Sequence, residues 1–217
     1  VIAEVGPGLV PGGELEIDPE RLVRWVEGFA ARHGPGRAEV GPDTVRLGSA
    51  DGSWALLDVP WPPWEPPPAT DPSFLAGVLA RHAARSRTLG ILLIRRGGWA
   101  VGVAEDGDLL VHKTGRRYVQ GRTAAGGWSQ QRYARRRANQ ADSLIEAVLD
   151  AAAQRLADPL DGLVVGGDRG LLEVALADSR LTRAAAAPRG PLLAIGDPSS
   201  AVLGDAARRG RAVRIHL

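Results

Sequence analysis

The chain has 217 residues, of which 44% are hydrophobic and 24% are charged, so it is long enough for one large or two small domains with a buried core. It contains no cysteine, which excludes disulfides and thiolate chemistry, and its four histidines lack the spacing of a zinc site, so we expect no metal and no cofactor. The formal net charge is only +2, no apolar run approaches the roughly 18 residues of a membrane span, and the amino end has no signal-peptide pattern, so we expect a soluble cytoplasmic protein without membrane contact.

The first 69 residues have the pattern of a small α+β unit. Asp18 and Pro19 are typical residues for the start of a helix, and apolar residues at helical spacing predict that this helix continues to His33. The segments 38–47 and 54–59 flank a turn rich in Gly and Ser and predict a hairpin.

A proline-rich strap follows at 60–68, where six of nine residues are proline and can form neither a helix nor a central strand. Its Trp61 and Trp64 either pin the strap to a neighbouring surface or stack on a ligand, and we favour the structural role. We place the domain boundary after residue 69, which gives an N-terminal unit of residues 1–69 and a second domain of residues 70–217.

The second domain begins with a helix from Asp71-Pro72 to about Ala84, with Phe74 among the residues expected to face inward. The apolar run 89–94 predicts a central strand, and the segments 99–104 and 109–113 flank a hairpin turn at 105–108. Three antiparallel strands therefore come before residue 120.

The remainder of the chain alternates helices and strands. A long helix that ends near residue 156 is followed by a strand at 162–167, a helix at 171–177, a strand at 191–195, a helix at 199–209 and a strand at 212–216. This order predicts an α/β fold with a mixed sheet, in which an antiparallel meander precedes αβαβ, an order shared by ribonuclease-H-like folds.

One stretch has an unusual charge distribution. Residues 109–141 contain no Asp or Glu, yet they carry eight fixed positive charges, on Lys113, Arg116, Arg117, Arg122, Arg132, Arg135, Arg136 and Arg137. Such a cluster repels itself unless a polyanion binds it, and arginine suits phosphate because its planar guanidinium donates two parallel hydrogen bonds. We interpret this stretch as a phosphate-facing surface, with Asn139 on the same helix face as Arg132, Arg135 and Arg136.

A glycine pair, Gly126-Gly127, lies in the middle of this stretch, and the long helix follows it. Glycine lets the backbone adopt positive φ and brings its N–H groups close to a substrate. Ser129 has no evident His and Asp partners, which argues against a hydrolase triad, and we interpret it as the helix N-cap.

Two further chemistries are weaker. A two-metal nuclease needs a carboxylate on the first strand, and 89–96 contains none. The segment 166–170, Gly-Gly-Asp-Arg-Gly, could hold a phosphate at a helix start, but it lacks the spacing of known phosphate loops and is more typical of a plain strand-to-helix turn.

The segment 126–137, Gly-Gly-Trp-Ser-Gln-Gln-Arg-Tyr-Ala-Arg-Arg-Arg, resembles the central domain of eukaryotic and archaeal class-one peptide release factors, which carry Gly-Gly-Gln before Arg-aromatic-Ala-Arg. It resembles more closely the Vms-type release factors, including actinobacterial members, which are implicated in cleaving peptidyl-tRNA on obstructed ribosomes. The resemblance covers about residues 89–217, and residues 1–85 are not matched. Trp128 stands where the release factors have their catalytic Gln.

The resemblance implies a peptidyl-tRNA hydrolase that acts on stalled ribosomes, with the large-subunit peptidyl-transferase centre and peptidyl-tRNA as partners. Gly126 and Gly127 match the motif, and Gln130 becomes the candidate catalytic residue, with Gln131 and Gln120 as alternatives. A glutamine amide can orient a water molecule and stabilise a developing oxyanion, although it is no strong base. The alternative is an RNA- or ribosome-binding module without hydrolytic activity.

Overall fold

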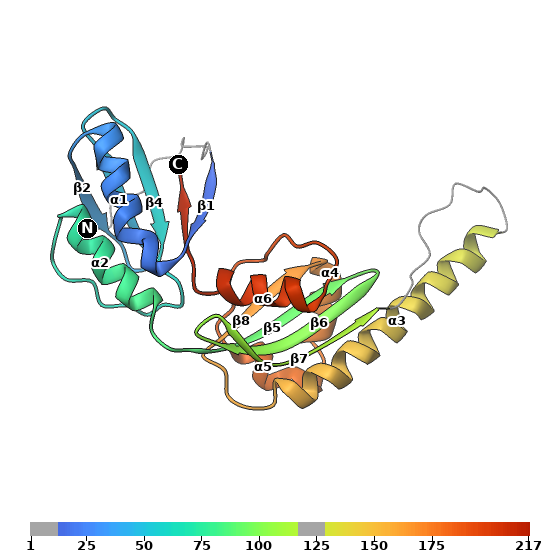
Figure 1. Ribbon diagram of the computed structural model, residues 1–217. Coiled ribbons are helices and arrows are strands. Elements are labelled where there is room, and N and C mark those ends of the chain that lie inside the picture. Colours follow the sequence, from blue (N-terminus) through green and yellow to red (C-terminus); the bar gives the residue numbers. More distant parts are fainter. Residues whose placement is uncertain (1–12, 117–128) are drawn as a thin grey trace. The chain divides into compact units, whose positions relative to one another are not determined.

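The computed structural model describes residues 13–116 and 129–217, and for residues 129–141 it describes the helical backbone without the side chains. The chain forms two compact units, one of residues up to Ala84 together with Ala212–Leu217, and one of residues Arg85–Arg211. Each unit has a β-sheet and helices of its own, so the protein is a mixed α/β protein (Figure 1).

The first unit packs two helices on a five-stranded antiparallel sheet of order β1-β9-β4-β3-β2. Its core contains Leu22 and Phe29 from a helix, Leu57 from a strand, and Trp64 from the proline-rich strap. Its elements are β1 (Glu14–Ile17), α1 (Pro19–His33), β2 (Gly36–Val40), β3 (Thr44–Ser49), β4 (Trp54–Asp58), α2 (Pro72–Ala83) and β9 (Val213–His216).

The second unit has a four-stranded mixed sheet of order β7-β6-β5-β8. Strands β5, β6 and β7 form the expected antiparallel meander, and β8 pairs in parallel with β5. Its elements are β5 (Thr88–Arg95), β6 (Gly98–Glu105), β7 (Asp108–Arg116), α3 (Ser129–Arg155), β8 (Gly162–Gly167), α4 (Arg169–Leu176), the short 3₁₀ helix η1 (Ser179–Leu181), α5 (Thr182–Ala186) and α6 (Ser200–Arg209).

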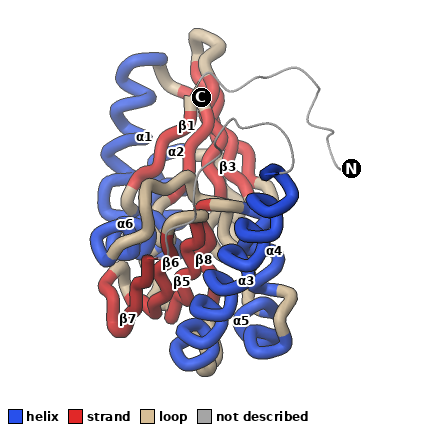
Figure 2. Tube along the Cα trace, turned by 90° about the vertical axis from the view of Figure 1, so that its right-hand side faces the viewer, coloured by secondary structure: helices blue, strands red, loops and turns tan. Residues whose placement is uncertain are grey.

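The alternation of side chains along β5 explains the layers. Leu92 and Ile94 point into the core that α3, α4 and α5 close, while Leu89, Ile91 and Leu93, with the opposite parity, are also fully or almost fully buried. Helix α6 packs against β5, β6 and β7, and Figure 2 shows it on the other side of this sheet from α3, α4 and α5. Both faces are therefore covered, as a continuous apolar strand requires.

The domain boundary falls differently from the expected cut at 69/70. Helix α2 packs on α1 and places Leu75 and Leu79 in the core of the first unit, so that unit continues to Ala84. Phe74 was expected to face inward and is 52% exposed. Trp64 is only 7% exposed, and its Nε1–H donates to the Gly41 carbonyl at 3.4 Å, so this tryptophan has the expected structural role.

Three expected strands need correction. Residues 38–47 form β2 and β3 with a turn at 41–43 between them, because Gly41-Pro42 interrupts the pairing. Residues 191–195 do not form a continuous strand. Arg189 and Leu193 each make one isolated parallel bridge to β8, and the register of pairing shifts by one residue between the two bridges. Pro191, which lies between them, has no N–H to donate. Strand β9 pairs with β1 and β4 in the first unit, so the αβαβ order does not continue in one sheet.

Candidate functional site

Among the side chains that the structure describes, those in the second half of the long helix α3 anchor it to the core. Leu144, Val148, Leu149 and Ala152 are buried in the core of the second unit, whereas the helix begins at Ser129. Its 27 residues span about 40 Å, while the eight residues of β5 span about 26 Å. Figure 1 shows the first half of α3 extending past the end of the sheet.

The predicted catalytic residues lie at and before the start of this helix. Gly126, Gly127, Gln120, Arg117 and Arg122 lie outside the described residues. Seven predicted residues lie in the first half of α3, and their side chains are outside the described part of the chain: Gln130, Gln131, Arg132, Arg135, Arg136, Arg137 and Asn139. Ser129, expected as the N-cap, is the first helical residue, and its side chain is likewise not described.

Strand directions bring basic residues together at the edge of the sheet next to this helix. Strand β5 ends at Arg95, and its hairpin partner β6 begins at Gly98. Gly98 pairs with Arg116, the exposed last residue of β7, after which residue 117 follows. Arg95, Arg96 and Arg116 therefore lie at the edge where the chain leaves the sheet towards the glycine pair.

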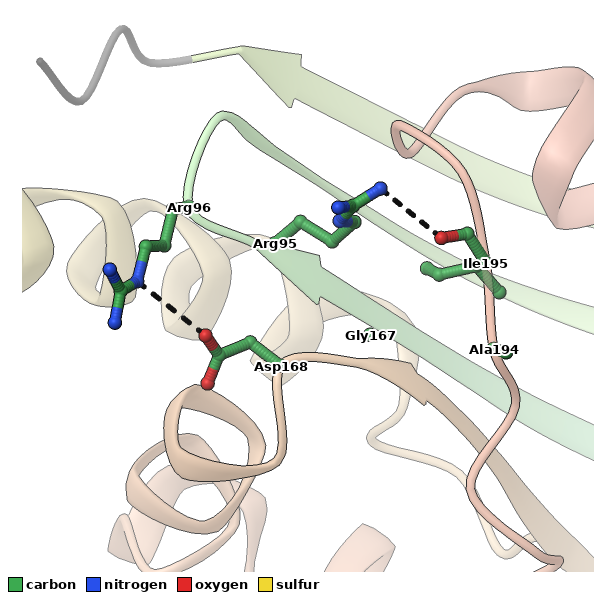
Figure 3. Close-up of a pocket in the computed structure, with 6 residues that line it drawn as sticks. All are labelled: Arg95, Arg96, Gly167, Asp168, Ala194 and Ile195. Carbon is green, nitrogen blue, oxygen red and sulfur yellow. Dashed lines mark hydrogen bonds and ion pairs between the residues drawn. The ribbon is translucent and has the colours of Figure 1, made fainter. Parts of the chain in front are cut away.

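The same edge contains a pocket of about 350 Å³ (Figure 3). Arg95, Arg96, Gly167, Asp168, Ala194 and Ile195 line it. It lies at the carboxyl ends of β5 and β8, the position at which α/β sheets commonly bind ligands. Figure 3 shows the two arginines reaching to opposite sides of the pocket.

Neither arginine is held tightly by an acid. Arg95 Nη1 donates to the Ile195 carbonyl at 3.2 Å and lies 3.7 Å from Oδ1 of the well-exposed Asp197. Arg96 Nε lies 3.7 Å from Asp168 Oδ2, and its side chain is 82% exposed. Exposed ion pairs of this length contribute little, so both guanidinium groups can exchange these partners for a phosphate.

The segment 166–170 forms the strand-to-helix turn that was the favoured interpretation. Gly167 has φ of +104°, and a Cβ there would overlap the Ile94 carbonyl, so glycine is required. Asp168 is the N-cap of α4, where its side chain accepts a hydrogen bond from Leu171 N–H at 3.2 Å. The helix N-terminus is thus capped by the protein's own carboxylate.

Arg95 and Arg96 were not predicted to belong to the basic surface. They precede the acid-free stretch by more than ten residues, and only the hairpin pairing of β5, β6 and β7 brings them beside Arg116. The available signal was the Arg-Arg-Gly-Gly sequence between two predicted strands, which marks a basic turn at a defined edge.

Among the residues that the structure describes, no group of three or more His, Asp or Glu side chains could hold a metal ion. No described helix combines the length and apolar character needed to cross a bilayer.

Comparison with known proteins identifies the second unit. The model of the Actinobacteria/chloroflexi VLRF1 release factor family matches residues 87–216. The chain belongs to this family. The VLRF1 match includes the glycine pair, all of α3 and the arginine-lined edge, and it confirms the resemblance to Vms-type release factors.

Solved structures with a similar fold include other release-factor-like proteins. The archaeal translation termination factor aRF1 is 16% identical over 77% of this chain, with a TM-score of 0.40, and this chain spans only 50% of its length. The Vms1 mitochondrial localization core is 12% identical over 90% of this chain and 80% of its own, with a TM-score of 0.38. Pelota from Archaeoglobus fulgidus is 15% identical over 94% of this chain and 65% of its own, with a TM-score of 0.35. No curated protein sequence matches this VLRF1-family chain.

Proposed function

We propose that this protein is a peptidyl-tRNA hydrolase of release-factor type that acts on stalled ribosomes in the cytoplasm. The observation that carries the proposal is the VLRF1 release-factor match over residues 87–216, because it includes the glycine pair and the helix that follows it. The long α3, anchored from Leu144 onwards, supports it, since such a helix can extend a loop away from the body of the protein.

The proposed reaction is hydrolysis of the ester that joins the nascent peptide to tRNA. The Gln130 side-chain amide orients a water molecule whose oxygen bonds to the ester carbonyl carbon. The bond to the tRNA ribose oxygen breaks, and the proton lost by the water passes to that oxygen. Backbone N–H groups at Gly126 and Gly127 stabilise the developing oxyanion, and the peptidyl-transferase centre of the large subunit encloses the reactants. Gln131 and Gln120 are the alternatives to Gln130.

The basic surface would bind ribosomal RNA and tRNA phosphates. It consists of Arg116, Arg117, Arg122, Arg132, Arg135, Arg136, Arg137 and Asn139. We add Arg95 and Arg96, because the strand pairing puts them at the same edge as Arg116. Binding through these residues should weaken as the salt concentration rises, because counterions are released from the RNA.

The second domain predicted from the sequence, residues 70–217, contains the second unit and is the proposed catalytic domain. Its classification as ribonuclease-H-like stays a prediction. The antiparallel meander followed by α3 and the parallel β8 supports it.

Peptide release from peptidyl-tRNA on purified stalled ribosomes tests the catalytic role. We expect Gln130→Ala to lower the release rate by about 10²–10³, the usual effect of losing one oxyanion-stabilising group, while ribosome co-sedimentation stays unchanged. Gln131→Ala and Gln120→Ala are the comparison variants, because they remove the same amide from the two alternative positions. Release that depends on one of these two instead would transfer the role to that residue.

A non-catalytic ribosome-binding module is the second candidate, and Trp128 favours it, because the release factors have their catalytic Gln at this position. This alternative predicts that peptidyl-tRNA stays intact during prolonged incubation of bound wild-type protein with stalled ribosomes. The proposed mechanism would also be contradicted if the wild type released the peptide and all three glutamine variants released it equally fast.

A further inference from the structure

The first unit has an aromatic series on one side of α1. Trp25, Phe29 and His33 follow one another at intervals of four residues, so they lie one above the next along the helix. The rings of Trp25 and Phe29 are stacked, with centroids 5.6 Å apart and an interplanar angle of 17°, and the Phe29 and His33 centroids are 4.8 Å apart. Phe29 is buried, whereas Trp25 and His33 are partly exposed.

This series borders a pocket of about 650 Å³, large enough for a nucleotide. Two kinds of side chain line it. The apolar wall consists of Trp25, Phe29, Trp54, Leu15 and Leu217, and the polar rim consists of Arg32, His33, Asp51 and Ser53 beside Gly52. The VLRF1 match begins at residue 87, so it assigns no role to these side chains.

The part of the chain that the structure describes leaves the apolar wall partly exposed. Leu15 pairs with Ile215 in the β1–β9 part of the sheet and is 39% exposed, although Ile215 beside it is fully buried. Trp54 is partly exposed, and the residue paired with it on β3, Gly48, has no side chain to cover it. Exposed apolar surface costs about 25 cal/mol per Å², and an aromatic ligand would remove this cost.

The polar rim has a fixed acceptor and a cation. Asp51 Oδ2 lies 2.9 Å from His33 Nδ1, and Asp51 Oδ1 accepts from Ser53 N–H at 2.9 Å. These hydrogen bonds, first that of Ser53 N–H and then that of His33, lower the pKa of the Asp51 carboxyl, so it stays ionised at neutral pH. Arg32 is exposed at the rim and makes no ion pair with any residue in the described part of the chain.

We propose that this pocket binds an unpaired base of single-stranded RNA. The base stacks on the exposed aromatic surface of Trp25 and Trp54, its amino group donates to Asp51, and its phosphate lies at Arg32. An apolar peptide would fill the wall but would leave the Arg32 guanidinium without an anionic partner and would not use the remaining acceptor capacity of the Asp51 carboxylate, which already accepts from Ser53 N–H. A base with its phosphate matches both, as in other single-strand sites that combine aromatic stacking with a cation. This proposal stands independently of the hydrolase activity.

Fluorescence anisotropy with a labelled eight-residue oligoadenylate and the whole 217-residue chain tests the proposal. We expect Trp25→Leu and Trp54→Leu each to weaken single-strand binding about tenfold, the usual effect of losing one stacking partner, and Arg32→Gln to weaken it less. Arg24→Gln is the matched control, because Arg24 is exposed on the same helix but does not line the pocket. Binding of the same sequence as an RNA duplex should be unchanged in all variants, since paired bases cannot enter the pocket.

Photo-cross-linking of the wild-type protein provides a second measurement that does not depend on the folding of any variant. An oligoadenylate with one central 5-iodouridine should give adducts on peptides that contain Trp25 or Trp54. Adducts confined to the arginine-rich second unit would overturn the proposal. Folded Trp25→Leu and Trp54→Leu variants that bind the single strand as tightly as the wild type would also overturn it.

Discussion

At the scale of single residues, Trp99 and Gly115 together hold the edge of the sheet from which the glycine loop departs. They are directly paired between β6 and β7, and Trp99 is buried in the core below α3. A Cβ on Gly115 would lie 2.4 Å from the indole ring, so only glycine leaves room for it. The indole therefore fixes the position of β7 one residue before Arg116.

We expect Gly115→Val to destabilise the second unit by about 1–3 kcal/mol, because the side chain overpacks a filled core. Urea unfolding followed by circular dichroism measures the change. Gly97→Ala is the matched control, since a Cβ at this position of the neighbouring hairpin meets no atom within 4 Å. Adding Trp99→Leu to Gly115→Val should cost less than the sum of the two single changes. Simple additivity would show that the two residues do not compete for this space.

The burial of an individual side chain could be predicted where a single physical effect decides it. Trp61 and Trp64 were both predicted to pin the strap, because burial is the commoner use of a tryptophan ring. Trp64 is buried in the core of the first unit, whereas Trp61 is partly exposed. Phe74 was predicted to be buried on helical spacing alone. Helical spacing shows which side of a helix is apolar, but it does not show how wide the buried part of that side is. In α2, Leu75 and Leu79 are buried, whereas Phe74 beside them is exposed.

At the scale of elements, a cluster of charges fixes the second half of α3 to η1. Arg180 Nη1 lies 3.1 Å from Glu146 Oε2 and 3.2 Å from Asp150 Oδ1, both on α3. Arg180 Nε donates to Asp178 Oδ1 at 2.9 Å. One guanidinium thus joins three carboxylates and holds the part of α3 from which the basic half extends.

This cluster predicts a pH dependence. The hydrogen bond from the Arg180 side chain lowers the pKa of Asp178 to about 2, from an ordinary value of 3.8. Because the folded pKa is the lower one, the unfolded state takes up the proton first. The stabilisation is complete above about pH 4 and is lost as the pH falls towards 2.

Arg180→Gln should remove this pH-dependent stabilisation, so the urea concentration at the midpoint of unfolding should fall less between pH 5 and pH 2 than in the wild type. Urea titrations at several pH values measure it, and Arg183→Gln serves as the control, since Arg183 lies on the neighbouring α5 and bonds only a carbonyl among the partners described. Parallel pH profiles for wild type and Arg180→Gln would contradict the assignment.

Elements were predictable where the pattern was long or strongly punctuated. The apolar run of β5 and the helices α1 and α2, each preceded by an Asp-Pro pair, fall close to their expected positions, although only Asp71 at α2 makes a side-chain capping hydrogen bond. The segment 191–195 is apolar enough for a strand, but Pro191 and the one-residue shift limit its pairing with β8 to single bridges. Strand β1 (Glu14–Ile17) was not predicted.

At the scale of the whole molecule, the order of elements along the chain did not reveal which sheet each strand joins. Strand β9 follows α6 of the second unit and was expected to extend the sheet there, but it pairs between β1 and β4. Local patterns predict a strand, whereas its partner depends on long-range packing of Val213 and Ile215 in another core. The basic edge was missed in part for the same reason, because strand pairing alone unites Arg95 and Arg116.

The position of β9 makes the first unit dependent on the last residues of the chain. Removal of residues 213–217 would leave β1 without its strand partner and would take Val213 and Ile215, both fully buried, out of the core. We expect backbone amides in β1 and β4 to lose protection in hydrogen-exchange mass spectrometry, while β5 and β8 keep theirs, because the second unit has a separate core. Ile215→Val is the control, since it keeps the strand and should cost only about 0.5–1.5 kcal/mol. Retained protection in β4 after the truncation would show that the first unit holds together without β9, and equal loss in β5 would show that the two units unfold as one.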